Sequence, residues 1–221
     1  MRNEMMHRPV IDENILNFLR HQQQPLTGPL KEFEDEVHAQ GVPVIPHETV
    51  NFFRVLLRIL EPQKILEIGT AVGFSAIMMA LSTPATTKIT TIDRYDEMIQ
   101  AAQANFKRFE LTQRIELLQG DAVDILPTLQ PTYDFIFMDS AKSKYVTFLP
   151  RCLELLSDRG ILLIDDIFQG GTVLQPLSTI KHRNHGIHKN LNKLFETVFN
   201  DPALISSVLP LGDGLLLVTK K

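Results

Sequence analysis

From residue 63 onward, short apolar runs alternate with longer amphipathic stretches. The runs are rich in β-branched residues, and the stretches between them carry apolar residues at helical spacing. Nearly continuous apolar strands that alternate with helices are typical of a parallel sheet covered on both faces. The predicted strands are KILEI (64–68), KITTID (88–93), RIELLQG (114–120), YDFIFMD (133–139) and GILLIDD (160–166), and the predicted helices lie near 74–82, 94–109 and 143–157.

The two ends of the chain follow different patterns. Residues 1–62 are predicted to be helical, with breaks at the proline- and glycine-containing segments 25–29 and 41–46. Near the other end, SSVLPL (206–211), a GDG turn and LLLVT (215–219) predict two antiparallel strands. The predicted fold class is therefore α/β. It is a Rossmann-like, doubly wound, seven-stranded sheet, mostly parallel with an antiparallel C-terminal strand and with helices on both faces.

Composition limits the class of protein further. The chain has 221 residues, 44% of them hydrophobic, which suits one folded domain over 1–221 and excludes a disordered chain. Its single cysteine, Cys152, excludes a disulfide scaffold and suits the cytoplasm. No apolar run is long enough for a membrane span, so no membrane partner is expected. The net charge of −4 argues against a surface that binds nucleic acid all over.

Glycines and acids follow the first three predicted strands. In LEIGTAVGFSA (66–76), Gly69 and Gly73 surround a strand-to-helix turn where a ligand could approach the backbone. Asp93 ends the second strand, where an acid commonly holds ribose hydroxyls, and Asp121 follows the third. The carboxyl ends of parallel strands meet at one edge, so these residues predict a nucleoside-type ligand there. The alternative is ordinary turn glycines with solvated acids.

A second group combines carboxylates with a lysine. Asp139, Asp165 and Asp166 follow two apolar strands, and Lys142 lies three residues after Asp139. Carboxylates so close to buried strands are costly unless they are paired or bind a metal. Oxygen ligands suit Mg²⁺ above all, then Mn²⁺ or Ca²⁺, whereas zinc is disfavoured because these two motifs contain no His or Cys. The alternative is that each Asp caps a helix, which does not explain the adjacent pair.

Together these motifs resemble those of the cation-dependent O-methyltransferases that use S-adenosylmethionine, the family of the catechol and caffeoyl-CoA enzymes. The resemblance rests on LEIGTAVGFSA, TID, QGDA, FMDSAK, LLIDD and GDG, and covers residues 42–221. It implies that 63–221 form the cofactor-binding core, that 1–62 form a helical cap or dimerisation segment, and that the protein is a homodimer. The S-adenosylmethionine site would be lined by Val44, Glu67, Gly69, Ser75, Asp93, Asp121, Ala122 and Asp139.

The same resemblance assigns the chemistry. Asp139, Asp165 and Asp166 would hold the divalent cation, and Lys142 would be the catalytic base. The family usually has Asp-Asn where this chain has Asp165-Asp166, so the site here carries one more negative charge.

One segment reverses the average charge of the chain. Residues 167–195 contain no Asp or Glu, and they include Lys181, Arg183 and Lys189. A purely basic segment in an acidic protein predicts an anionic ligand. The alternative is a solvated basic helix face.

Within the family, several segments are most similar to the bacterial tRNA 5-hydroxyuridine methyltransferases. They are PVI (43–45), EIGTAVGFSAI (67–77), KRFEL (107–111), the basic segment and PLGDGL (210–215). This similarity implies that the partner is a tRNA anticodon loop, which Lys181, Arg183 and Lys189 would bind, and that the wobble 5-hydroxyuridine becomes 5-methoxyuridine. Three alternatives remain: a small catechol-like or hydroxycinnamoyl phenolic acceptor, an NAD-dependent oxidoreductase, and an RNA-binding module without catalysis.

Overall fold

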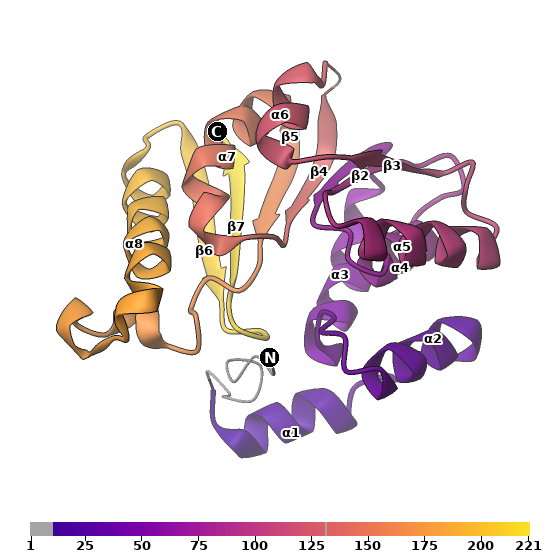
Figure 1. Ribbon diagram of the computed structural model, residues 1–221, viewed down its shortest axis with the longest axis horizontal. Helices are drawn as coiled ribbons and strands as arrows, with labels where there is room; N and C mark the ends of the chain where they lie inside the picture. Colours follow the sequence, from indigo (N-terminus) through magenta and orange to yellow (C-terminus); the bar gives the residue numbers. More distant parts are fainter. Residues whose placement is uncertain (1–10, 131) are drawn as a thin grey trace.

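The computed structural model describes residues 11–130 and 132–221 (Figure 1). Its strands form one seven-stranded sheet in the order β3-β2-β1-β4-β5-β7-β6. The bounds are β1 (Lys64–Ile68), β2 (Lys88–Asp93), β3 (Ile115–Gln119), β4 (Tyr133–Met138), β5 (Leu156–Ile164), β6 (Leu204–Leu209) and β7 (Leu215–Lys220).

The sheet confirms the predicted topology. β1 to β5 pair in parallel, while β7 lies antiparallel between β5 and β6. β5 begins at Leu156, before the predicted residue 160, because the register with β4 shifts between Tyr133 and Phe135 and lets Leu156 pair with Tyr133.

Helices cover both faces of the sheet (Figure 1). Alternate strand residues point to opposite faces. Ile65 and Phe137 pack with α2 to α5, whereas Leu66 and Met138 pack with α6 to α8. The helices are α1 (Glu13–His21), α2 (Gly28–Ala39), α3 (His47–Leu60), α4 (Phe74–Leu81), α5 (Asp96–Arg108), α6 (Ala122–Ile125), α7 (Tyr145–Leu155) and α8 (His185–Asn200).

The second half of the basic segment begins the helix α8. In α8, Leu191, Leu194 and Val198 are buried against the sheet, at the spacing of one helix face. The opposite face carries the exposed Lys189 and Lys193. Lys189 and Lys193 therefore match the alternative, a solvated basic helix face, whereas Lys181 and Arg183 lie in the segment before α8.

The N-terminal helices follow the predicted breaks, although residues 1–10 of the predicted helical segment lie outside the described residues. α1 and α3 expose four large apolar side chains, while the homodimer implied by the resemblance stays a prediction. The four side chains are Ile15, Phe18, Val55 and Ile59. Within residues 11–130 and 132–221, no helix is long and apolar enough to cross a membrane.

Candidate active site

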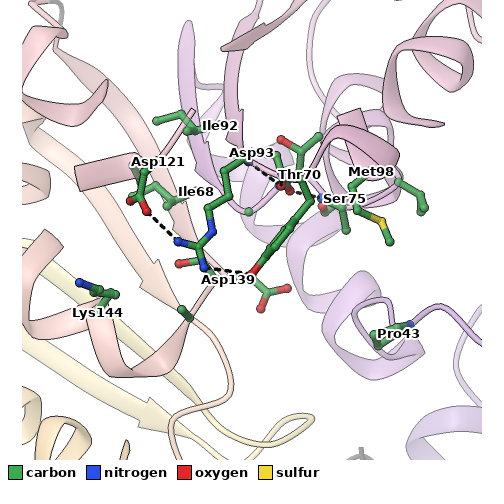
Figure 2. A pocket seen from close by; sticks show the side chains of 18 of the residues that line it. Pro43, Ile68, Thr70, Ser75, Ile92, Asp93, Met98, Asp121, Asp139 and Lys144 are labelled. Atoms are coloured by element: carbon green, nitrogen blue, oxygen red, sulfur yellow. Dashed lines mark hydrogen bonds and ion pairs between the residues drawn. The ribbon is translucent and has the colours of Figure 1, made fainter. Parts of the chain in front are cut away.

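A cavity of about 470 Å³ opens over the carboxyl ends of β1 to β4 (Figure 2). It lies where an open parallel sheet binds its ligands. The structure brings most of the predicted cofactor residues together on its wall: Val44, Gly69, Ser75, Asp93, Asp121, Ala122 and Asp139.

The packing of the turn after β1 requires a glycine at position 69. Its φ is +108°, and a Cβ there would lie 1.8 Å from the carbonyl oxygen of Asp139. Gly73, with φ of +85°, leaves room for the ring of Phe106. The sequence interpretation assigned both glycines to ligand approach. The structure shows that they let the turn after β1 close against its neighbours, which in turn shapes the cavity wall.

Asp93 organises two turns of the cavity wall. One carboxylate oxygen accepts hydrogen bonds from the backbone N–H groups of Thr70 and Ala71, at 3.1 and 2.9 Å. The other accepts from the N–H groups of Arg94 and Tyr95, at 2.7 and 3.0 Å. These bonds hold the carboxylate rigidly at the cavity edge, which suits the role in ribose binding predicted for it.

Glu67 lies behind this wall rather than on it. Its side chain is fully buried, and its two oxygens accept hydrogen bonds from Ser75 Oγ and Thr91 Oγ1, each 2.5 Å long. Burial raises the pKa of Glu67 to about 8, and the charges of Asp139 and Asp93 contribute in the same direction. Glu67 therefore supports Ser75 from below, and at neutral pH its neutral form predominates in the cofactor-free protein.

The raised pKa of Glu67 predicts a specific pH dependence of stability. Between the ordinary pKa of 4.5 and about 8, only the unfolded chain ionises this group, so its contribution to folding falls as pH rises. Glu67→Gln removes the titration and should gain stability relative to the wild type, on the order of 3 kcal/mol between pH 5 and 8. Urea unfolding without cofactor at both pH values measures this. Glu116→Gln, at an exposed position on β3, is the control. Equal pH slopes in Glu67→Gln and wild type would contradict the prediction.

Arg94 and Tyr95 are cavity residues that the sequence interpretation missed. Both line the cavity, and the Arg94 guanidinium has Nη1 2.7 Å from Asp121 Oδ2 and Nη2 2.9 Å from the Tyr95 hydroxyl. Asp121 also caps α6, since its Oδ1 accepts from Val123 N at 2.9 Å. This backbone bond and the guanidinium lower the pKa of Asp121. The available sequence signal was the position of Arg94, directly after the strand-ending Asp93.

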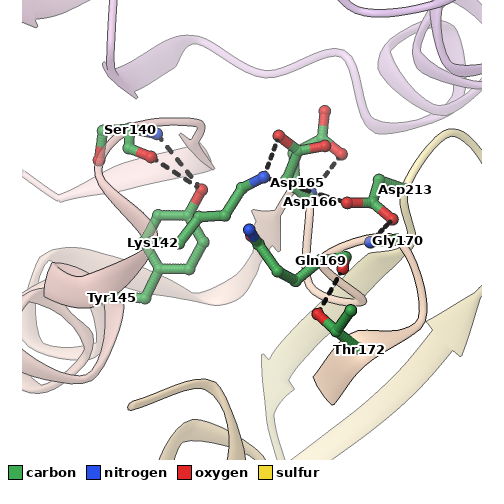
Figure 3. Close-up of polar contacts among 9 residues, drawn as sticks. All are labelled: Ser140, Lys142, Tyr145, Asp165, Asp166, Gln169, Gly170, Thr172 and Asp213. Atoms are coloured by element: carbon green, nitrogen blue, oxygen red, sulfur yellow. Dashed lines mark hydrogen bonds and ion pairs between the residues drawn. The ribbon is translucent and has the colours of Figure 1, made fainter. Parts of the chain in front are cut away.

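A polar cluster lies beside the cavity, centred on Lys142 (Figure 3). Its side chain is only 12% exposed, and Nζ lies 2.7 Å from Asp166 Oδ2 and 4.0 Å from Asp213 Oδ2. Asp165 Oδ1 accepts from the N–H of Asp166 at 2.6 Å. Asp213 was also missed as a site residue, although it is the acid of the GDG turn.

The cluster holds more negative charge than Lys142 balances. Burial raises the pKa of Asp139 to about 7, and the charge of Asp166 adds to this effect. Burial together with the charges of Asp166 and Asp139 raises the pKa of Asp165 well above its ordinary value. Burial also raises the pKa of Asp213 to about 6. Desolvation is the main physical cause and repulsion between the carboxylates adds to it, and a further cation would offset both by favouring the ionised forms.

The backbone at Asp166 has a conformation that favours particular residue types. Its φ of +57° is left-handed, a conformation that Asn and Asp adopt more readily than other side chains. The departure from the family's usual Asn therefore keeps the backbone conformation and changes only the charge.

The donor set fits a hard divalent cation. Within residues 11–130 and 132–221, no three His, Cys, Asp or Glu side chains are already arranged as a coordination shell. The cluster nevertheless gathers several carboxylates around one lysine, and it contains a buried oxygen without a hydrogen-bond partner, Asp213 Oδ2. Such oxygens are the ligands that Mg²⁺ takes in proteins.

An open α/β sheet with a nucleoside-sized cavity over its carboxyl edge, beside a buried acid–lysine cluster, defines the class of an S-adenosylmethionine-dependent methyltransferase. The chain belongs to the O-methyltransferase family, whose model, described as O-methyltransferase, matches residues 24–221. This membership sets aside the oxidoreductase and the RNA-binding module without catalysis.

Three similar proteins carry methyltransferase names that are consistent with this family. The caffeoyl-CoA O-methyltransferase of Stellaria longipes is 28% identical, with 97% of this chain and 90% of the relative covered. The catechol O-methyltransferase domain-containing protein 1 of Mus musculus is 30% identical over 82% of this chain and 69% of its own. The S-adenosylhomocysteine-bound Podospora anserina methyltransferase PaMTH1 superposes with a TM-score of 0.85 at 25% identity, covering 95% of this chain and 94% of that one. The protein is an S-adenosylmethionine-dependent O-methyltransferase.

Proposed function

We propose that this enzyme methylates the 5-hydroxyl of wobble 5-hydroxyuridine in tRNA, in the cytoplasm, with S-adenosylmethionine as donor and Mg²⁺, or Mn²⁺ or Ca²⁺, at the acidic cluster. The observation that carries the proposal is a set of four exposed basic side chains with no acid between them in the sequence, Lys181, Arg183, Lys189 and Lys193, which we call the basic surface. A phenol needs no such surface, whereas an anticodon loop presents phosphates around a splayed base.

The basic surface is available to an anionic partner. All four side chains are exposed, and none of them forms an ion pair within the described part of the chain. The helix α8, which carries Lys189 and Lys193, packs against the 3₁₀ turn Lys142–Lys144. Phosphates bound by Lys189 and Lys193 would therefore lie on the solvent side of α8, across the helix from its buried face.

The reaction needs an oxygen nucleophile held in line with the methyl group. The S–CH₃ bond breaks as the O–CH₃ bond forms, and S-adenosylhomocysteine leaves. A divalent cation held by Asp139, Asp165 and Asp166 would supply Lewis-acid stabilisation of the ionised hydroxyl. Lys142 is ion-paired with Asp166 as an ammonium, so it would first lose that proton to solvent, and its neutral Nζ would then receive the hydroxyl proton. The cavity wall around Gly69 and Asp93 would hold the donor.

The nucleosides of cellular tRNA test the proposal. In a strain without this gene, mass spectrometry should find that 5-methoxyuridine is lost and 5-hydroxyuridine accumulates, because the last step is missing. Purified enzyme with S-adenosylmethionine and Mg²⁺ should restore the methyl group, and EDTA should prevent this. Unchanged 5-methoxyuridine in the deletion strain would contradict the proposal.

A small phenolic acceptor is the second candidate. It is supported by the relative in Stellaria longipes that is named a caffeoyl-CoA O-methyltransferase. A catechol has the same pair of adjacent oxygens as 5-hydroxyuracil, where the hydroxyl lies next to O4. Both acceptors would use the same cation and Lys142, so they differ in what surrounds the oxygen pair.

A further inference from the structure

Gln169 is a buried polar residue that the mechanism above does not use. It lies in the loop after β5, three residues beyond Asp166, and is 8% exposed. Its Oε1 is buried and has no hydrogen-bond partner. Figure 3 shows its side chain extending toward Lys142. The unpartnered amide therefore faces the part of the site where the acceptor hydroxyl must lie.

The loop holds Gln169 in a fixed and unusual conformation. Its φ of +50° is left-handed, which is uncommon for a residue other than glycine. Its carbonyl oxygen accepts hydrogen bonds from Thr172 Oγ1 and N, at 2.6 and 3.2 Å. The next N–H, of Gly170, donates to Asp213 Oδ1 at 2.7 Å. These bonds anchor the backbone on both sides, so the amide is presented at a defined place.

A buried amide oxygen without a donor is costly, and a ligand that supplies the donor recovers that free energy. Gln offers an acceptor and an N–H₂ donor side by side. The complementary partner has a carbonyl oxygen next to an N–H group. A uracil ring has this arrangement at O4 and N3–H, whereas a catechol has a ring C–H at the corresponding position.

The O4 atom of the uracil ring can contact the cation and the Gln169 carboxamide at the same time. One of its lone pairs points to the side of the 5-hydroxyl, where the two oxygens together would meet the cation. The other points to the side of N3. We propose that the Gln169 carboxamide binds the O4 and N3–H edge of the base, and so selects a uracil over a phenol with the same two oxygens. This inference rests on the proposed function.

Three acceptors test the proposal: an anticodon stem-loop RNA with 5-hydroxyuridine, the same RNA with the base methylated at N3, and catechol. Wild-type enzyme should prefer the first RNA over the second, and Gln169→Leu should lower kcat/KM for the first RNA, each by about tenfold to a hundredfold. The variant should also lose most of the discrimination against N3-methylation, and its catechol turnover should stay within about twofold. Gln175→Leu, the same substitution at an exposed position of this segment, is the control.

The outcomes separate the two proposals. If the wild type methylates both RNAs equally, Gln169 does not read N3–H, and this result needs no variant that might misfold. If Gln169→Leu keeps the wild-type discrimination, the inference is also overturned. In both cases the tRNA function stands. An enzyme that methylates catechol and neither RNA would overturn both proposals.

Discussion

Lys142→Met is expected to lower the rate of methyl transfer by about 10²–10⁴-fold, the usual contribution of a positioned proton acceptor. The affinity for S-adenosylmethionine should stay within about twofold. The reason is geometric: Lys142 lies in the acidic cluster, with Nζ 2.7 Å from Asp166, and is not among the residues that line the cofactor cavity. Single-turnover transfer to catechol and calorimetric titration with the cofactor measure the two quantities. Methionine keeps most of the volume of the side chain, so a packing defect should be small.

The control for this experiment is Lys107→Met, which removes an exposed lysine from α5. It should leave both quantities unchanged. Transfer within threefold of wild type in Lys142→Met would refute the assignment of the base. A parallel loss of cofactor affinity would show instead that Lys142 supports the cavity.

Local sequence signals were sufficient for the strands that carry the site. β1 and β2 have the predicted bounds, because each is an apolar run that ends at a glycine or an acid. The acids at those ends then follow from topology, since parallel strands place their carboxyl ends at one edge. For this reason Gly69, Asp93 and Asp121 could be placed at one cavity from the sequence.

Residues that enter the site through non-local pairing could not be placed in this way. Asp213 reaches Lys142 because β7 inserts between β5 and β6, and no local pattern specifies that order. Arg94 reaches Asp121 by the length of its side chain. Gln169 shows no signal in sequence, because its importance comes from burial and from the absence of a partner. The sequence shows Asp166 at the position where the family usually has Asn. That both residues suit this position follows from its left-handed backbone, which only the structure shows.

The average charge of the chain concealed two opposed environments. The carboxylates of Asp165 and Asp213 are buried, and the pKa values of both and of Asp139 are raised mainly by burial, with the charges of neighbouring carboxylates adding to the effect. The basic surface is exposed and faces solvent. A divalent cation at the acidic cluster and phosphates at the basic surface would bind independently. Variants of the basic surface should therefore change RNA binding without changing the chemistry at the acidic cluster.

Reversing the charge of Lys181, Arg183 and Lys189 to glutamate together is therefore expected to lower kcat/KM for tRNA by about a hundredfold or more at low salt. Each lysine or arginine that contacts a phosphate releases counterions, so the slope of log kcat/KM against log salt should also become shallower by about 2. Turnover of catechol should remain within about twofold, because the cluster around Lys142 is untouched. Steady-state kinetics with both acceptors over a range of salt concentrations measures these effects.

The matched control reverses Lys64, Lys88 and Lys107 instead. It changes the net charge by the same amount, but Lys64 and Lys88 lie at the amino ends of β1 and β2, the edge of the sheet away from the cavity. A loss of tRNA activity that is equal in the two triple variants would mean that only the overall charge matters, and the basic surface would then have no specific role. Loss confined to the first variant, with a reduced salt slope, is the result that a phosphate-binding surface requires. Equal losses for tRNA and catechol in that variant would instead point to damage to α8, whose packing against the turn Lys142–Lys144 connects the basic surface to the base.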